Sequence, residues 1–332
     1  MAQMKYFYEL TISSSPHAHS PVTTQTIMRD VLIALIPAML GSIYFFGFRS
    51  LLVTLVSAAA CVFFEWGFCK IRKLHCKTYD LSAVVTGVLL AFVCPVTIPY
   101  WTIILGDFFA IVLVKMLFGG LGKNIVNPAL AGRAFLFSWP VLMSNWVKVG
   151  FDNAAGLLST ADAVTAATPM SAMHQGALPE ESILDMFLGN IGGCIGETSA
   201  LLLIVGFIYL LYRKVITARI PLAYIGTVAI LAFLFPQGND RIAWMAAQVF
   251  GGGLMLGAIF MATDSVTSPL TKLGQIVYGI GCGVITILIR YFGGYSEGVT
   301  YAILCMNACA VLLDKIGRPV KFGAPKKEAA KK

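Results

Sequence analysis

Two short stretches, Cys94-Pro-Val-Thr-Ile-Pro99 and Asp264-Ser-Val-Thr-Ser-Pro269, decide how this chain folds. They share a Val-Thr pair and a final proline. In each, the Val-Thr pair begins nine residues after a glycine, Gly87 or Gly257. A Phe-Gly-Gly triplet follows each stretch downstream, at 118–120 and at 292–294. The same series of residues therefore occurs twice, about 170 residues apart, which indicates an internal repeat.

The composition indicates an integral membrane protein. The chain has 332 residues, of which 58% are hydrophobic and only 12% charged, and its mean hydropathy is +0.81. Soluble domains carry about 25% charged residues. The first apolar run begins near Val31 and is too long for the core of a signal peptide, so we expect the first span itself to direct insertion.

Apolar runs long enough to cross a bilayer, about 20 residues, predict ten transmembrane helices. We expect these helices near 29–47, 50–69, 80–95, 101–118, 129–147, 187–212, 220–235, 242–262, 274–291 and 299–314. The third run ends at Pro95 and Pro99, and Pro140 lies inside the fifth. The predicted fold class is therefore an all-α membrane protein with proline-broken helices.

The repeat divides these ten helices into two halves of five. Since five is odd, the second half enters the membrane upside down, which is the architecture of inverted repeats. The predicted organisation has five parts. They are an N-terminal segment (1–28), a first repeat (29–147), a polar loop (148–186), a second repeat (187–314) and a basic tail (315–332).

The distribution of basic residues predicts the orientation. Of the 24 lysines and arginines, 19 fall on the side that holds both termini. The other side receives Arg49, Arg133, Lys148, Arg241 and Arg290. By the positive-inside rule, both termini are cytoplasmic and the 148–186 loop faces outward. We expect the basic tail to attract anionic lipid headgroups. Because the net charge of +8 lies beside spans and in this tail, it does not predict nucleic-acid binding.

The cysteines and histidines do not predict a metal site. Eight cysteines are scattered, without a C-x-x-C pair, and free cysteines pack as small hydrophobic residues. Cys94 is of interest because it stands where the second half has Asp264. The four histidines form no metal or triad pattern. We also expect Gly251-Gly252-Gly253, inside a span, to cradle no phosphate, and we expect the chain not to bind NAD itself, since no Rossmann-type unit is present.

The polar loop contains Asp162-Ala-Val-Thr165-Ala-Ala-Thr168. This stretch resembles the D-x-x-(S/T)-G-A-T signature, at whose last threonine a transferase esterifies flavin mononucleotide (FMN). Ala166 stands where the signature usually has glycine, which keeps the position small but less flexible. We expect Thr168 to lie in an exposed, extended and uncrowded segment that such a transferase can reach.

Further stretches resemble the NqrB/RnfD family in the expected order. They are the N-terminal Ser13-Ser-Ser-Pro-His-Ala-His19, the block from Gly122 to Phe135 that contains Asn-Ile-Val-Asn-Pro, and the block from Met261 to Thr271. Together they span nearly the whole chain. Its length is closer to that of the RnfD members, because NqrB has a longer N-terminal extension.

The resemblance implies an electron-transfer subunit of a prokaryotic, multi-pass membrane complex. That complex couples ferredoxin and NAD to the pumping of Na+ or H+, so the chain acts with other Rnf subunits and is not catalytic alone. The family carries FMN as a phosphoester on the threonine that is Thr168 here, with Asp162 and Thr165 in the motif. The flavin would lie on the outer face, so electrons must cross the bilayer through partner subunits. NqrB also holds a non-covalent riboflavin, to which Asn124, Asn127 and Pro128 would contribute.

The residues themselves support a site at these blocks. Asn124, Asn127 and Arg133 lie at the mouth of a predicted helix, where a flavin ring would find amide donors and a positive charge. Asp264 lies at a broken helix, where a carboxylate is costly and indicates a functional site; capping of a helix end is the alternative. Glu65, Asp107 and Glu197 also fall in or near spans, and Glu65 and Glu197 would line an ion path or pair with loop lysines.

Two other functions remain open at this point. Inverted repeats with broken helices also suit a small-solute channel or transporter, such as the urea-channel-like proteins, because a fold does not fix a function. A scaffold with a degenerate motif is the third. The loop motif separates these interpretations, since a plain channel needs no flavinylation signature.

The orientation predicts which side of the membrane the loop can be labelled from. A cysteine beside Asp152, as in Asn153→Cys, should react with a membrane-impermeant maleimide added outside intact cells. Reaction only with cytoplasmic reagent would reverse the predicted topology.

Overall fold

The computed structural model describes residues 22–73, 78–143, 145–146, 168–179, 181–238 and 240–317. Every regular element in these ranges is a helix, which confirms the all-α prediction. Asp162, Thr165 and most of the predicted polar loop lie outside the described residues, as do most of the N-terminal segment and nearly all of the tail.

The first half contains these elements: α1 (Thr24–Phe46), α2 (Phe48–Ile71), η1 (Thr78–Asp80), α3 (Ser82–Phe92), α4 (Tyr100–Phe108), η2 (Phe109–Met116), α5 (Pro128–Leu136) and α6 (Pro140–Met143). The element η2 is a π-helix that directly continues α4. A non-helical segment with two turns, 93–99, carries the first Pro-rich stretch and separates α3 from α4.

The second half follows two short helices. Its elements are α7 (Pro169–His174), α8 (Ile183–Leu188), α9 (Ala200–Tyr212), α10 (Arg219–Leu234), α11 (Arg241–Phe250), α12 (Leu254–Leu256), η4 (Gly257–Met261), α13 (Lys272–Phe292) and α14 (Val299–Leu313). In this half the π-helix η4 continues α12 and precedes the second Pro-rich stretch, 264–269.

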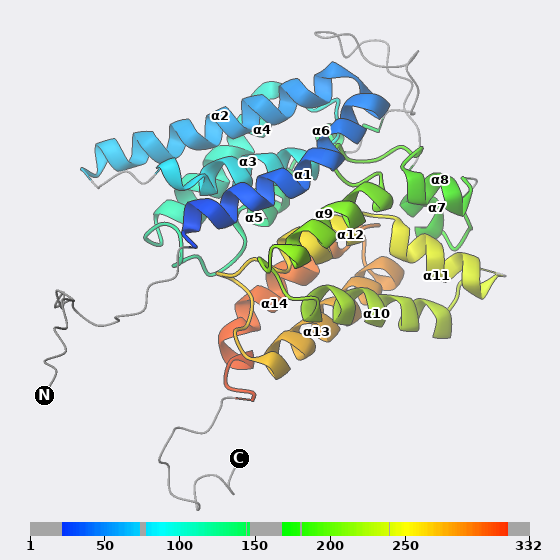
Figure 1. Cartoon of the computed structure of the whole chain (residues 1–332). Coiled ribbons are helices and arrows are strands. Elements are labelled where there is room, and N and C mark those ends of the chain that lie inside the picture. Colours follow the sequence, from blue (N-terminus) through cyan, green and yellow to red (C-terminus); the bar gives the residue numbers. More distant parts are fainter. Residues whose placement is uncertain are drawn as a thin grey trace, which may run out of the picture.

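The helices of the two halves pack in the same order. In the first half α2 packs against α3 and α4, and η2 packs against α5; in the second, α10 packs against η4 and α13, and α13 against α14. The halves lie side by side and meet where α1 packs against α9 and α5 against α14 (Figure 1). These pairs occupy corresponding places in the repeat, which supports the two-half organisation; its inversion across the membrane stays a prediction.

The predicted number of ten full spans is not confirmed. Among the described residues, three helices are long and apolar enough to cross a membrane alone: α1, α2 and α13. Helix α11 and the α12–η4 unit form a fourth candidate, bent by 58°. The third expected span stops at Phe92, the fifth stops at Leu136 before Pro140, and residues 189–199 separate α8 from α9. Prolines and glycines divide these runs, because they disfavour continuous helix.

The outer surface of the long helices is apolar, as a lipid-facing surface requires. Large hydrophobic side chains stay exposed at many positions along α1, α2, α9 and α10, for example Leu40, Tyr44, Phe63, Ile208 and Leu222. A water-facing surface would scatter such residues singly among charges. Together with the composition, this surface identifies the chain as a membrane protein.

Two non-helical segments, 93–99 and 189–199, are held by polar contacts inside the molecule. Arg49 donates from Nε to the carbonyl of Val96 at 2.8 Å, and from Nη2 to those of Thr97 and Ile98 at 3.5 and 3.4 Å. The chain before Pro95 also pairs with the 189–199 segment. The backbone amide of Ile195 donates to the carbonyl oxygen of Cys94 at 3.0 Å, and that of Gly196 donates to the carbonyl oxygen of Phe92 at 2.9 Å. Non-helical backbone at membrane depth needs such partners, since lipid supplies none.

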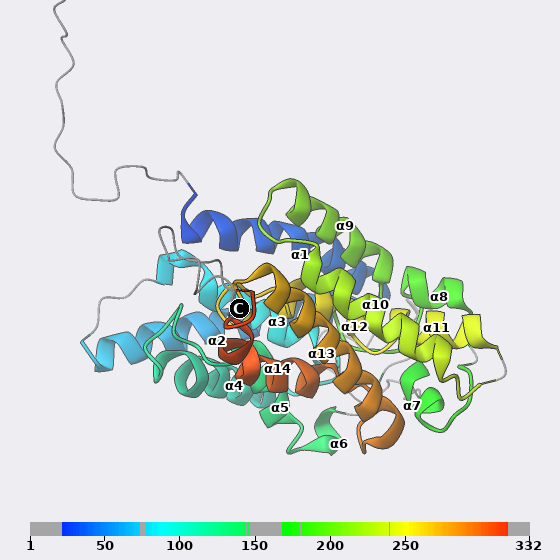
Figure 2. The same ribbon diagram turned by 90° about the horizontal axis from the view of Figure 1, so that it is seen from below.

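The start of α1 and the end of α14 lie toward one end of the molecule, while α7 and α8 lie toward the other, as seen in both views (Figures 1 and 2). The chain segment that precedes α7 therefore joins the described structure at the end away from both termini. This arrangement accords with a loop and termini on opposite sides.

The close approach of residues 92–94 to residues 195–196 can be tested at Gly196. A Cβ at this position would overlap the ring of Phe92, whereas a Cβ at Gly226 in α10 would meet nothing within 4 Å. We expect Gly196→Ala to destabilise the protein by about 1–3 kcal/mol through overpacking. Gly226→Ala should be neutral or stabilising, by up to about 1 kcal/mol, because alanine favours helix. Thermal unfolding in detergent would compare them; equal midpoints would contradict the pairing.

Candidate cofactor sites

Thr168 is the first described residue after the loop and directly precedes α7. Its backbone is extended, with φ −76° and ψ 151°, and Pro169 begins the helix. The side chain does not cap α7, and its hydroxyl has no hydrogen-bond partner among the described residues.

The expected exposure of Thr168 is wrong, because only 8% of the residue is accessible. Helix α7, which follows Thr168 directly, packs into the protein. Met170 and Met173 are buried, and Nδ1 of His174 lies 2.9 Å from the carbonyl oxygen of Arg290. The expected extended backbone at Thr168 is confirmed, but the segment is not uncrowded.

Thr168 lines a small cavity, here named the Thr168 cavity. Two non-helical segments of the second half, 189–199 and 251–253, also line it. Two acidic side chains, a thiol and three consecutive glycines line it. The lining residues used below are Thr168, Cys194, Glu197, Gly251, Gly252, Gly253 and Glu297. Of these, the sequence predicted a cofactor role only for Thr168.

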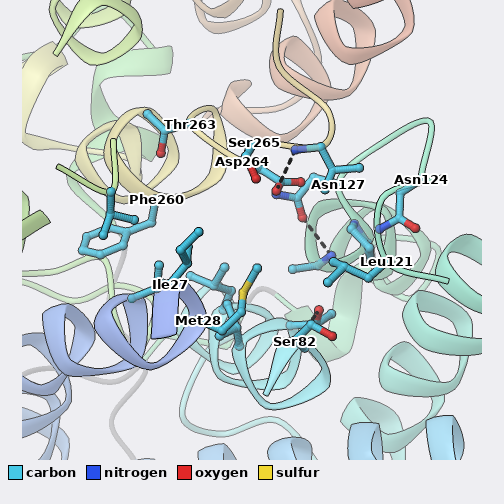
Figure 3. Close-up of a pocket in the computed structure, with 18 of the residues that line it drawn as sticks. Ile27, Met28, Ser82, Leu121, Asn124, Asn127, Phe260, Thr263, Asp264 and Ser265 are labelled. Atoms are coloured by element: carbon cyan, nitrogen blue, oxygen red, sulfur yellow. Dashed lines mark hydrogen bonds between the residues drawn. The ribbon is translucent and has the colours of Figure 1, made fainter. Parts of the chain in front are cut away.

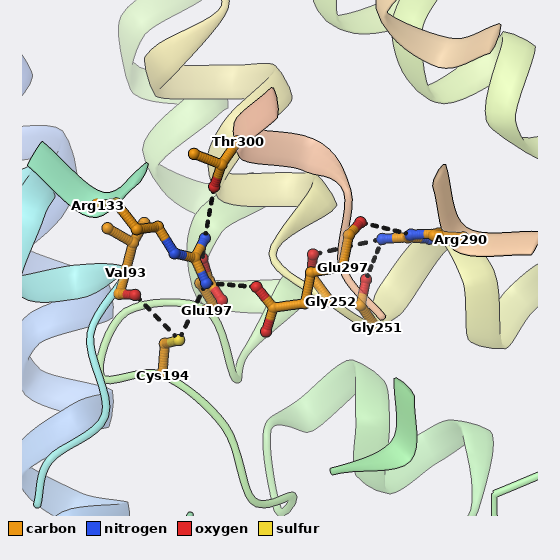
Figure 4. Close-up of polar contacts among 9 residues, drawn as sticks. All are labelled: Val93, Arg133, Cys194, Glu197, Gly251, Gly252, Arg290, Glu297 and Thr300. Atoms are coloured by element: carbon orange, nitrogen blue, oxygen red, sulfur yellow. Dashed lines mark hydrogen bonds and ion pairs between the residues drawn. The ribbon is translucent and has the colours of Figure 1, made fainter. Parts of the chain in front are cut away.

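A buried arginine joins the two acids of this cavity (Figure 4). Arg133 of α5 donates from Nη1 to Glu197 at 3.1 Å and from Nη2 to Glu297. The same guanidinium contacts Thr300 Oγ1 at 3.2 Å and Cys194 Sγ at 3.5 Å. Arg133 is 2% exposed. An ion pair at this depth is stable only when its hydrogen bonds are nearly complete, so these side chains form one interdependent cluster.

Arg290 organises the opposite wall from the end of α13. Its guanidinium donates to Gln248 Oε1 at 2.8 Å and to the carbonyls of Gly251 and Gly252 at 3.2 and 3.3 Å. Its Nε also donates to the carbonyl of Glu297 at 3.0 Å. Arg290 thus holds the α11–α12 break and the Glu297 backbone in one arrangement (Figure 4).

The glycine triplet is required by these close approaches. Gly252 and Gly253 have φ of 65° and 67°, in the left-handed region that favours glycine. A Cβ at Gly252 would lie 2.8 Å from Arg290 Nη2, and one at Gly253 would overlap the Glu197 carboxylate. We expected this triplet to lie unremarkably inside a span. Instead it forms the chain break beside Thr168; whether it contacts a phosphate stays untested.

A second, larger cavity lies between the halves and is here named the Asn124 cavity (Figure 3). Its volume is about 90 Å³, and it is partly open to the surface. Its polar lining includes Ser82, Lys115, Asn124, Asn127, Thr263 and Asp264, with Pro128 beside them. The structure therefore brings Asn124, Asn127, Pro128 and Asp264 together, as the sequence predicted.

The two asparagines differ in what their side chains already bind. Asn127 Oδ1 accepts from the amides of Ala129 and Leu130 at 3.0 and 3.5 Å, which caps α5, and its Nδ2 donates to the Met261 carbonyl at 3.2 Å. Asn124 is also buried, yet its Oδ1 has no partner. A buried polar atom without a partner is costly, so Asn124 has an acceptor to offer to a ligand.

Asp264 accepts hydrogen bonds within its own segment. Its Oδ1 accepts from the amide of Val266 at 3.3 Å, and its Oδ2 accepts from the Thr267 hydroxyl at 3.1 Å. These contacts stabilise a turn, whereas the N-cap of α13 is Thr271, so the helix-capping alternative considered from the sequence is not confirmed. The carboxylate still lines the Asn124 cavity.

Arg133 does not join the asparagines, contrary to the expected grouping. It lies six residues beyond Asn127 on α5, which places it about 9 Å further along the axis and roughly 240° around it. The side chain consequently points to the Thr168 cavity. Glu297 was not among the predicted site residues, and Arg290 was used only to predict the orientation. The signal that could have found both is a charged residue near a predicted span.

The fold and the two cavities define the class of protein: an all-helical membrane protein whose broken helices enclose buried charged clusters. Residues 11–323 match the model of the NQR2, RnfD, RnfE family. The chain therefore belongs to that family, which confirms the resemblance drawn from its motifs.

Curated relatives of similar length agree with this assignment. The chain is 45% identical to the D subunit of the Na(+)-translocating ferredoxin:NAD(+) oxidoreductase complex of Acetobacterium woodii, over 96% of both chains. It is 44% identical to the D subunit of the proton-translocating ferredoxin:NAD(+) oxidoreductase complex of Clostridium ljungdahlii, over 94% of this chain and 96% of that protein. Identity to the D subunit of the ion-translocating oxidoreductase complex of Actinobacillus succinogenes is 33%, over 93% and 96%.

Proposed function

We propose that this chain is the D subunit of an ion-translocating ferredoxin:NAD+ oxidoreductase complex and carries FMN as a phosphoester on Thr168. The names of the relatives support the first part. The second part is supported by the motif that ends at Thr168 and by the free hydroxyl of this residue, which opens into a cavity lined by other polar groups. The alternative of a small-solute channel loses its support once the family is known.

The Thr168 cavity is small, about 20 Å³, so only the phosphoester end of a covalently held flavin would lie against it. The charges of its two glutamates are offset by two arginines, Arg133 and Arg290, so the phosphoester would meet a cluster with no net charge rather than an acidic one. The glycine triplet leaves the wall beside Thr168 free of side chains. The protein would supply position and electrostatics, while the bound flavin would supply one- and two-electron chemistry.

The burial of Thr168 gives this proposal a further element. A transferase acts on an accessible hydroxyl, yet only 8% of Thr168 is exposed. We infer that the transferase modifies the chain before α7 docks onto α13 through the His174–Arg290 contact, or while that contact is open. Other Rnf subunits would then supply the cofactors that exchange electrons with this flavin.

The covalent flavin is tested by replacing Thr168. Wild-type chain made together with its transferase should fluoresce under ultraviolet light on a denaturing gel and gain the mass of one FMN phosphoester. Thr168→Ala should lose both signals completely, because no other hydroxyl takes its place. Thr160→Ala, a control that removes a hydroxyl of the same loop outside the motif, should keep a modified residue at 168. An unmodified wild-type chain would refute the proposal.

We also propose that the Asn124 cavity holds a second, non-covalent flavin such as riboflavin. The support is the unpartnered Oδ1 of Asn124, which would accept from a ring N–H, and the partly open cavity that this residue lines, which would take one edge of the ring system. Asp264 and Lys115 would add charges of both signs along the same wall.

This second site is tested by flavin that acid releases from the purified protein. Wild-type protein should release flavin on acid precipitation while its covalent FMN stays with the pellet. Asn124→Leu should lose about 90% of the releasable flavin or more, since the lost hydrogen bond and the changed side-chain shape each weaken binding. Thr263→Val serves as the control, because the Thr263 hydroxyl already donates within its own helix. Equal release from both variants would exclude the site.

A further inference from the structure

One buried acid in the first half has no counter-charge. Asp107 of α4 is 0% exposed. Its Oδ1 accepts from Ser57 Oγ at 2.7 Å and from Cys61 Sγ at 3.2 Å, whereas its Oδ2 has no partner. No ion pair reaches it among the described residues. A carboxylate in this state is expensive to keep charged.

The other buried acids of the described chain are compensated. Glu65 pairs with Lys115 at 3.1 Å, Glu197 pairs with Arg133 at 3.1 Å, and Asp30 pairs with Arg213 at 3.1 Å. Asp264 accepts a backbone amide. Asp107 is therefore the acid whose charge depends most directly on whether a proton is present.

The Ser57 hydroxyl suits both protonation states of Asp107. It lies 2.7 Å from Asp107 Oδ1 and 2.8 Å from the carbonyl of Gly87, and both contacts are of hydrogen-bond geometry. A hydroxyl has one proton to donate, so it cannot serve both acceptors at once. When Asp107 is ionised, Ser57 donates to it; when Asp107 is protonated, the carboxyl donates to Ser57, which turns to Gly87.

A row of polar groups leads from the Asn124 cavity to this acid. Ser57, Cys61 and Glu65 are spaced by four residues on α2 and so share one face. Glu65 pairs with Lys115, whose Nζ also donates to Ser82 Oγ at 2.7 Å. Lys115 and Ser82 line the Asn124 cavity. The titratable groups facing this row are thus Cys61 and Glu65 from α2, Lys115 from η2, and Asp80 from η1, whose Oδ1 accepts from Ser82 Oγ at 2.6 Å.

The helix that carries Asp107 and Lys115 is irregular between them. It changes at Phe109 from α-helix to π-helix. Eight residues of regular α-helix would rotate the second side chain by about 80° from the first, yet both meet the same face of α2. π-helical segments are frequent at functional sites. In the second half, by contrast, Tyr278 and Asn307 form a neutral buried hydrogen bond at 2.6 Å.

We propose that Asp107 is a proton-binding site that loads and unloads through the Ser82–Lys115–Glu65 row. Each cycle converts one carboxylate and one proton into a carboxylic acid and back, with Ser57 changing its acceptor. A proton suits this site better than a metal cation, because its neighbours are one hydroxyl and one thiol rather than a shell of oxygens. The inference deepens the proposed function, on which it rests, by assigning a residue to ion movement.

The first test uses the wild-type complex in its membrane and needs no variant. Dicyclohexylcarbodiimide reacts with protonated carboxyls in apolar surroundings, and peptide mass spectrometry locates the adduct. We expect an adduct on Asp107 whose yield falls as the pH rises and does not change with Na+. No adduct on Asp107 would overturn the proposal, and so would protection by Na+ that is independent of pH, which would indicate a sodium site.

The second test measures ions moved per electron in sealed vesicles that contain the whole complex. Asp107→Asn should lower this ratio by about tenfold or more, because an amide binds no proton, and Asp107→Glu should restore part of it. Asp240→Asn is the matched control: Asp240 is exposed and caps α11, and asparagine caps helices equally well. A wild-type ratio in assembled Asp107→Asn complex would overturn the proposal.

The same samples keep this inference separate from the flavin proposal. Gel fluorescence of the wild-type chain reports on Thr168, whereas the carbodiimide adduct reports on Asp107. If Asp107→Asn complex fails to assemble on a native gel, the adduct in the wild-type complex decides the question. Absent fluorescence with a pH-dependent adduct would refute the flavin alone.

Discussion

The structure depends on one constraint: chain that leaves the helix inside a membrane must find partners for its backbone within the protein. Two buried arginines meet it in parallel ways. Arg49 binds carbonyls of the 96–98 segment in the first half, and Arg290 binds those of Gly251 and Gly252 in the second. Each guanidinium replaces several lost helical hydrogen bonds, and its charge is spread over carbonyl dipoles. The Thr168 cavity lies beside the second of these breaks.

The charged clusters follow from the same constraint. Once a break is held open, its neighbourhood is polar enough to accept Arg133 with Glu197 and Glu297, or Lys115 with Glu65. Such pairs contribute little net stability, but loss of one partner leaves a buried charge and costs about 3–5 kcal/mol. These clusters therefore fix which helices lie together. Arg133, for example, ties α5 of the first half to the chain just before α9 and α14.

The sequence predicted the all-helical membrane fold, the repeat and the places where helices break, because proline, glycine and apolar periodicity act locally. It predicted that Asn124, Asn127 and Asp264 would belong to one site, because both blocks that carry them resemble those of the family. It did not predict that Arg133 would turn away from them, because that depends on the rotation of α5. The burial of Thr168 and the role of Glu297 arise from contacts between segments over a hundred residues apart, which no local pattern reveals. Asp162 and Thr165 fall outside the described residues, so their part in the motif stays a prediction.

The pairing of residues 92–94 with 195–196 limits how the protein can move. Many inverted-repeat transporters work by rocking one half against the other. Here two backbone hydrogen bonds join the two halves at residues 92–94 and 195–196. At Gly196 the two segments lie so close together that they cannot slide past each other. Large rocking would strip these groups of partners where no water replaces them. The proton site proposed at Asp107 suits such a fixed frame, because its loading needs only a hydroxyl rotation and a proton transfer.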